Sequence, residues 1–401
     1  MRVRELVIGA VTVACLAACT SGSNEPAKSK PTKDVVRTID PSKATTMKLG
    51  EDLKIVAQLP STFEKQDTYF RGFTADGKVL GSVSLPEKPK NDGMVGGELT
   101  TQAYPVLYDV ATKKFTVLDH RKRRRNTAVW SIVSSGDFVV WLESPETTAS
   151  SSAVAIYSYD RRSKKVAELF STDPPDSIMN GGDDLAVWDG TAYFSRFACC
   201  RKRDRGNAAV YSVPIDGSAP ATVLVKGGKW VDLAGGSLTY EMRDKQFSRD
   251  LETGETKPVP VSPRAKDPGF CGAELTASFE TLCLGRPSMV EGETLVDDAA
   301  LTITETAGRT TVLQPFPVEA DSDSAPRHVV PIGPWVGVTM TDAGGADRLF
   351  LVDLESKAVK AFPSNSAFAA VNDDNTQALL RIERSGQKTW PQLIVQIPPV
   401  S

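Results

Sequence analysis

Histidine is scarce in this chain: among 401 residues there are two, His120 and His328. A hydrolase with a histidine-activated nucleophile would have to use one of these two side chains. The sequence also contains no Gly-x-Ser-x-Gly nucleophile elbow and no His-Glu-x-x-His motif. These absences argue against enzymes built on such motifs. We therefore predict no catalytic residue and no cofactor.

Spacings typical of metal ligands are also missing. No Cys-x-x-Cys pair occurs, and neither histidine has a cysteine within ten residues. Structural zinc sites depend on such spacings, because their ligands come in closely spaced pairs. No metal site is predicted.

Long apolar runs are absent after residue 18. The first 18 residues contain one, from Leu6 to Ala18, and its 13 residues fall short of the roughly 20 that span a membrane. Arg2 and Arg4 precede it. A short apolar run after positive charges is typical of a secretory signal.

This run ends in Leu16-Ala17-Ala18-Cys19, which resembles the lipobox of bacterial lipoprotein precursors. The resemblance implies that residues 1–18 are a lipoprotein signal peptide and that Cys19 is lipidated. The protein would then be extracytoplasmic and lipid-anchored to the cell membrane. An ordinary signal peptide that happens to contain Cys19 is the alternative. Small and polar residues dominate positions 20–33, so we expect a flexible tether over 19–50 and a folded domain over 51–401.

Charge of one sign is not in excess. The chain has 47 Lys and Arg against 50 Asp and Glu, a net charge of -3. Such a balance gives no overall attraction to a polyanion. Nucleic acid is therefore not an expected partner.

Short strands in a repeating order are what the sequence does contain. Several segments read as two alternating strands joined by a Gly, Asp or Asn turn, then a third strand with an Asp-led turn into a fourth. From Asp109 to Ile397 the mean repeat is 48 residues. A four-stranded unit of about 40 to 50 residues is typical of a propeller blade. We count seven units, at 66–119, 127–171, 183–226, 229–262, 270–316, 327–363 and 367–397.

The predicted fold class is therefore all-β: a β-propeller of seven four-stranded blades, closed by an N-terminal strand. Residues 53–59 are expected to supply the outer strand that the last unit lacks, which would remove exposed sheet edges. Six blades and a β-sandwich array are the alternatives. The architecture resembles the bacterial WD40-like and TolB-type propellers, without their motifs. Trp188-Asp189 falls in a turn, and we interpret this pair as coincidental.

Four cysteines besides Cys19 lie in the expected mature domain: Cys199, Cys200, Cys271 and Cys283. An even number suits disulfide pairing in an oxidising compartment. Cys271 and Cys283 flank one predicted hairpin, so their disulfide is the favoured hypothesis. The alternative joins Cys199 and Cys200 to the other two.

Two basic runs interrupt the balanced composition. They comprise Arg121, Lys122, Arg123, Arg124 and Arg125, and then Arg201, Lys202, Arg203 and Arg205. In a propeller both connections emerge on the same face, so the two runs would form one basic rim. An anionic headgroup, an anionic polymer or an acidic envelope protein would be its partner. Solvated loops are the alternative.

These observations favour a membrane-anchored binding or assembly platform whose basic rim contacts an anionic partner. The runner-up is an enzyme that acts on an extracellular glycan or peptide with carboxylates in the central channel.

Overall fold

A computed structural model describes most of the chain from residue 36 onward. The described residues are 36–40, 43–86, 101–121, 127–144, 147–148, 151–152, 154–172, 185–196, 208–234, 236–243, 245–258, 279–284, 289–290, 293–294, 301–305, 310–313, 326–333, 335–341, 347–363, 365–382 and 391–396. Residues 36–401 form one compact unit. No helix in this described part is long and apolar enough to cross a membrane.

The described strands form seven sheets of four or five strands. The first four sheets follow the chain order. They contain β4 (Thr62–Phe63), β5 (Gln66–Phe73), β6 (Val79–Pro86), β7 (Thr101–Asp109) and β8 (Lys114–Val117); β9 (Ala128–Ser135), β10 (Phe138–Ser144), β13 (Ala155–Asp160) and β14 (Lys165–Ser171); β15 (Leu185–Trp188), β16 (Thr191–Arg196), β17 (Ala209–Pro214) and β18 (Thr222–Lys226); β19 (Lys229–Ala234), β20 (Ser237–Met242), β21 (Lys245–Asp250) and β22 (Thr256–Pro258).

The last three sheets each include a strand from the N-terminal segment. They contain β1 (Val36–Ile39), β27 (Thr310–Leu313), β26 (Leu301–Glu305) and β23 (Phe279–Leu284); β2 (Thr45–Thr46), β31 (Val359–Ala361), β30 (Asp347–Asp353), β29 (Trp335–Thr341) and β28 (Pro326–Ile332); β3 (Lys54–Leu59), β34 (Gln392–Gln396), β33 (Gln377–Ile382) and β32 (Ser366–Val371). Two short hairpins complete the described strands: β11 (Thr147–Thr148) with β12 (Ser151–Ser152), and β24 (Met289–Val290) with β25 (Glu293–Thr294).

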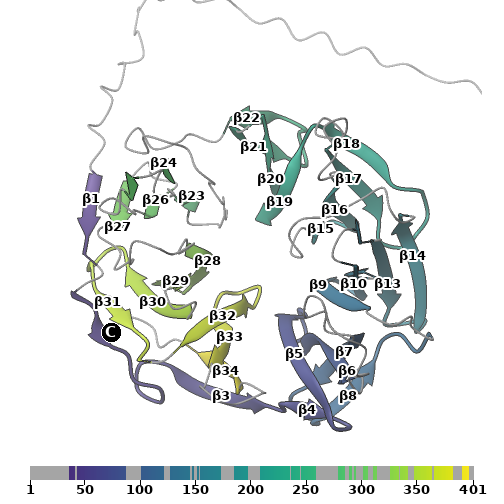
Figure 1. Ribbon diagram of the computed structural model, residues 1–401, viewed down its shortest axis with the longest axis horizontal. Helices are drawn as coiled ribbons and strands as arrows, with labels where there is room; N and C mark the ends of the chain where they lie inside the picture. The colour runs from purple at the N-terminus through teal and green to yellow at the C-terminus, as the bar shows by residue number, and fades with distance from the viewer. Residues whose placement is uncertain are drawn as a thin grey trace, which may run out of the picture. The chain divides into compact units, whose positions relative to one another are not determined.

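The sheets stand in a ring, with β5, β9, β15, β19, β28 and β32 toward its centre (Figure 1). The prediction of an all-β propeller is confirmed. Within the sheets from β5 to β22, successive strands pair antiparallel, as alternation of apolar and polar residues favours.

The predicted Asp-led turns follow the third strands. Asp109, Asp160 and Asp353 each accept a hydrogen bond from a backbone N–H two or three residues later, at 2.8–3.0 Å. Asp250 does the same after β21, which the sequence pattern had not indicated. A carboxylate that accepts such a bond stabilises a tight turn.

The predicted closing strand pairs as expected. β3 runs antiparallel to β34, with Lys54 opposite Gln396 and Leu59 opposite Gln392. The Gln392 side chain also reaches the first sheet: its Oε1 accepts from Phe70 N at 2.8 Å and its Nε2 donates to Thr68 O at 2.9 Å. The closing strand therefore completes the last sheet, and the buried amide of Gln392 joins that sheet to the first.

The tether prediction needs correction over residues 36–50. β1 pairs in parallel with β27, and β2 pairs in parallel with β31, so the segment before β3 runs along two further sheets. Met47 is 1% exposed and packs in the core between two sheets. The cause is apolar burial, since a segment that buries such a side chain has a reason to be ordered. Residues 19–35 stay a predicted tether.

The described core lies between neighbouring sheets rather than in one central body. Five clusters of buried apolar side chains join successive sheets, and the largest contains Met47, Leu53, Trp335 and Phe368. Each sheet thus depends on its neighbours, as expected for repeats that cannot bury their faces alone.

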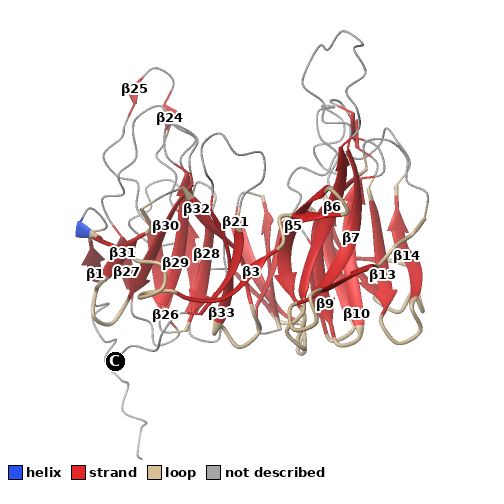
Figure 2. Ribbon diagram, turned by 90° about the horizontal axis from the view of Figure 1, so that it is seen from below, coloured by secondary structure: helices blue, strands red, loops and turns tan. Residues whose placement is uncertain are grey.

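The ring has two different faces. The turns between first and second strands, and between third and fourth strands, gather on one face, which we call the turn face; it is the lower side in Figure 2. Second strands end and third strands begin on the opposite face, which we call the loop face. β8 and β16, which precede the two predicted basic runs, both end on the loop face.

Candidate functional site

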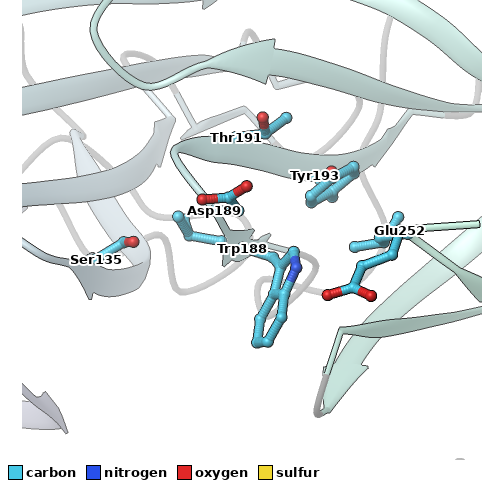
Figure 3. A pocket seen from close by; sticks show the side chains of 8 residues that line it. Ser135, Trp188, Asp189, Thr191, Tyr193 and Glu252 are labelled. Carbon is cyan, nitrogen blue, oxygen red and sulfur yellow. The ribbon is translucent and has the colours of Figure 1, made fainter. Parts of the chain in front are cut away.

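An open hollow of about 700 Å³ lies on the turn face. We call it the Trp188 hollow. It is lined by turns and strand ends from three successive sheets: Ser135, Val187, Trp188, Asp189, Thr191, Tyr193, Leu251 and Glu252. Figure 3 shows Trp188 with Asp189 on one side and Glu252 on the other.

Trp188 is half-buried and packs against apolar side chains between the third and fourth sheets. Its ring lies over Gly236 in the next sheet, where a Cβ atom would stand 2.9 Å from Cζ2 of Trp188. Gly236 also has a φ of +79°. Glycine at this position thus provides the space in which the indole lies.

Asp189 and Gly190 form the two-residue turn between β15 and β16, with φ values of 43° and 71°. Asp-Gly is the sequence that such a turn favours, since both residues must take positive φ. The turn leaves Asp189 exposed at the edge of the hollow. Behind it lies Tyr193, 8% exposed, whose pKa is raised by burial and, to a smaller extent, by the charge of Asp189.

Both carboxylates of the hollow are exposed. Neither Asp189 nor Glu252 forms an ion pair with any residue that the structure describes. The hollow therefore presents two negative charges, an indole face and the hydroxyls of Ser135 and Thr191 to solvent.

A second group of side chains also combines aromatic rings with two carboxylates, but its carboxylates are buried. We call Asp119, Arg121, Trp141, Glu143 and Tyr157 the Arg121 cluster. Asp119 and Glu143 are 1% and 4% exposed. Trp141 donates from Nε1 to Oε2 of Glu143 at 2.9 Å, and its ring stacks on Tyr157 with centroids 5.6 Å apart.

Arg121 supplies the cation of this cluster. Its Nη2 lies 2.6 Å from Oδ2 of Asp119 and 3.9 Å from Oε1 of Glu143, and its guanidinium carbon lies 3.8 Å from the centroid of Tyr157. Partial burial lowers the pKa of Arg121, but hydrogen bonds to Asp119 and Tyr157 outweigh this effect, so the pKa is raised overall. Two buried carboxylates are thus compensated within the chain.

A third carboxylate, Asp232, lies on the inner strand β19. Burial raises its pKa from 3.8 to about 6, and the backbone N–H of Leu233 donates to its Oδ1 at 2.8 Å. Perturbed carboxyl groups are candidates for functional sites.

Most residues of the predicted basic rim lie outside the described part. This applies to Lys122, Arg123, Arg124, Arg125, Arg201, Lys202, Arg203 and Arg205. Arg121 is described, and its guanidinium is occupied by Asp119 and Tyr157. The basic rim therefore stays a prediction.

Most of the cysteines in the predictions also lie outside the described residues. Cys19 and Cys271 are not described, whereas Cys283 lies on β23 opposite Thr302. The lipid anchor on Cys19 and the Cys271–Cys283 disulfide stay predictions.

The Trp188 hollow was missed by the sequence analysis. Its only local signal is the Asp-Gly turn after Trp188, which predicts a hairpin but no site. The other lining residues come from turns that are distant in sequence, such as Ser135 and Glu252.

Comparison with known proteins identifies the fold but not a family. No family model matches the chain, and no curated protein matches it. An acylaminoacyl peptidase from Pyrococcus horikoshii has a similar structure, with a TM-score of 0.50 and 11% identity over 86% of this chain. The match covers 54% of the peptidase chain, so this chain spans about half of that protein.

Two other solved structures are similar at lower scores. A chain of the mitotic checkpoint complex gives a TM-score of 0.45 at 11% identity, covering 97% of this chain and 99% of that one. The N-terminal domain of Nup159 gives a TM-score of 0.45 at 12% identity, and the match covers 90% of this chain and 99% of that domain. At such identities the likeness shows the fold alone, and a propeller is compatible with a binding or assembly platform.

Proposed function

We propose that this protein is a membrane-anchored, extracytoplasmic propeller that acts as a binding or assembly platform. The observation that carries this proposal is the Trp188 hollow, where an indole and two carboxylates that have no ion-pair partner among the described residues face solvent. Groups of this kind on a rigid scaffold are available to a partner. The lipobox-like sequence ending at Cys19 supports the anchored location.

The basic rim remains part of the proposal as a second contact. Eight Lys and Arg residues, excluding the internally paired Arg121, would face an acidic envelope protein or anionic polymer on the loop face. The platform would then bind differently charged partners on its two faces.

The test is crosslinking of the protein in its native membrane, followed by identification of the captured partners. Wild type would be compared with two variants. One carries Asp189→Asn and Glu252→Gln; the other carries Arg123→Ser, Arg124→Ser, Arg125→Ser, Arg201→Ser and Arg203→Ser. We expect each variant to lose a different partner. Identical capture by all three proteins would contradict a platform that uses either surface.

Asp232 favours one second candidate function, which is acid–base chemistry at the inner strands. A carboxyl group with a pKa of about 6 can donate or accept a proton near neutral pH. Wild type and an Asp232→Asn variant would be incubated with cell-wall glycan fragments and with peptides. Cleavage by wild type alone would support this candidate, and no cleavage by either would reject it.

A further inference from the structure

We infer that the Trp188 hollow binds the cationic side chain of a partner protein, an arginine or a lysine. This inference rests on the proposed function as a binding platform and specifies the chemistry of the group that the hollow takes. It is argued from the chain itself, which contains both an occupied and an open version of the same arrangement.

The occupied version is the Arg121 cluster. There a guanidinium lies 3.8 Å from the centroid of Tyr157 and pairs with the carboxylate of Asp119, beside Trp141 and Glu143. Aromatic faces and carboxylates both attract a cation, and the two effects act together when water is partly excluded. The cluster shows that this chain uses the combination to hold an arginine.

The Trp188 hollow has the corresponding groups. Trp188 and Tyr193 supply the aromatic rings, and Asp189 and Glu252 supply the carboxylates. What differs is the cation, because neither carboxylate has an ion-pair partner in the described part of the chain. The component that the Arg121 cluster contains and the hollow lacks is therefore a positive charge.

The shape of the hollow suits a side chain with an apolar stem. Val187 and Leu251 add apolar surface beside the indole, and the volume of about 700 Å³ is within the range of small-ligand sites. Arginine and lysine place methylene groups against apolar surface while the charged end meets polar groups. A small cationic molecule would fit the same charges, and the experiment compares its binding with that of a peptide.

The hollow is held by rigid elements rather than by adaptable loops. Trp188 is positioned by Gly236 of the next sheet, and Asp189 is fixed in a two-residue turn. Groups that are positioned before binding lose little conformational entropy when a ligand arrives.

The experiment is a titration of the full-length protein in a non-ionic detergent, labelled with 5-fluorotryptophan. The fluorine signal of Trp188 would be assigned with a Trp188→Phe variant. The probes are N-acetyl-arginine amide, N-acetyl-lysine amide and N-acetyl-citrulline amide, which resembles the arginine probe but is neutral. An arginine-containing tripeptide, Gly-Arg-Gly, and a neutral oligosaccharide, cellotetraose, complete the set.

We expect the arginine and lysine probes and the tripeptide to move the Trp188 signal, with a Kd on the order of 1 mM. The double variant Asp189→Asn with Glu252→Gln should bind the arginine probe about tenfold more weakly. The matched control is Glu64→Gln with Asp67→Asn, which removes the same two kinds of charge from the β4–β5 hairpin on the loop face. This control should bind like wild type.

Three results would overturn the inference. Equal binding of the citrulline and arginine probes would show that the hollow does not recognise a positive charge. A shift with cellotetraose alone would make the hollow a saccharide site. Binding of the amides without the tripeptide would make it a site for small cationic molecules rather than for the side chain of a peptide.

A Trp188 signal that moves with no probe would also overturn the inference. The proposed function as a platform is tested independently, because the crosslinking experiment identifies captured partners and does not depend on these probes.

Discussion

The Arg121 cluster and the Trp188 hollow contain similar groups and differ in one of them. In the cluster, Asp119 and Glu143 are buried and Arg121 compensates them. In the hollow, Asp189 and Glu252 are exposed and have no cation among the described residues. A buried charge requires an opposite charge within the fold, whereas an exposed charge is solvated and remains accessible to another molecule. We therefore expect the Arg121 cluster to stabilise the fold and the Trp188 hollow to bind a partner.

The largest expected effect comes from removing the cation of the cluster. Arg121→Ala leaves Asp119 and Glu143 buried without their partner, so we expect a loss of about 3 kcal/mol in the free energy of unfolding. The measurement is urea unfolding at pH 7. The control is Arg162→Ala, because Arg162 is mostly exposed and pairs with Asp137 at the surface. Equal stability of the two variants would mean that the cluster does not stabilise the fold.

The second effect concerns Asp232, which is half-buried and, unlike Asp119, forms no ion pair with any described residue. Its pKa rises from 3.8 to about 6, so folding is favoured when it is protonated. Its contribution is full below about pH 4 and is lost as pH rises through 6. Asp232→Asn stays neutral at all pH values. We expect the variant to be more stable than wild type by about 2 kcal/mol at pH 7.5.

The check is thermal unfolding of both proteins between pH 4 and pH 8. The advantage of the variant should shrink as pH falls toward 4. A constant difference across this range would show that titration of Asp232 is not its cause.

A third, smaller effect is expected at the partly exposed ion pair between Arg161 and Asp76. Arg161 of the second sheet donates to Asp76 of the first at 2.6 Å and holds the pKa of Asp76 well below its usual range. This stabilisation is present at neutral pH and is lost as pH falls. Asp76 is 44% exposed, so solvent screening leaves about 0.5 kcal/mol for Asp76→Asn to remove at pH 7. The unfolding midpoints of variant and wild type should converge toward pH 2.

The smallest effect should come from the hollow itself. The double variant Asp189→Asn with Glu252→Gln removes charges that the fold does not use, so its stability should stay within about 0.5 kcal/mol of wild type. Asparagine also tolerates the positive φ of position 189. Urea unfolding beside Glu64→Gln with Asp67→Asn measures this. A loss as large as that of Arg121→Ala would place the hollow among the structural groups.

The sequence predicted the local parts of this fold better than the distant ones. The hairpins and their Asp-led turns were readable because alternation and turn residues lie close together, as around Asp109 and Asp160. The closing strand over 54–59 was also predicted. The pairing of β1 and β2 was not, because each is short and pairs in parallel with a strand some 300 residues away in sequence.

The candidate site was less predictable for the same reason. Trp188 and Asp189 are adjacent in sequence, but Glu252 belongs to the next sheet and comes near them only through the packing of the two sheets. Arg121 was assigned to a basic rim because its neighbours are basic. Its role in the cluster depends on Glu143 and Tyr157, which local sequence does not connect to it.

The most direct test of the central claim is unfolding of the full-length protein with and without N-acetyl-arginine amide. A ligand that binds only the folded state stabilises it, by about 1.4 kcal/mol at ten times its Kd. We predict this gain for wild type and for Glu64→Gln with Asp67→Asn, and its loss in Asp189→Asn with Glu252→Gln. Equal stabilisation of all three proteins, or of none, would contradict the claim that the Trp188 hollow receives a cation from a partner.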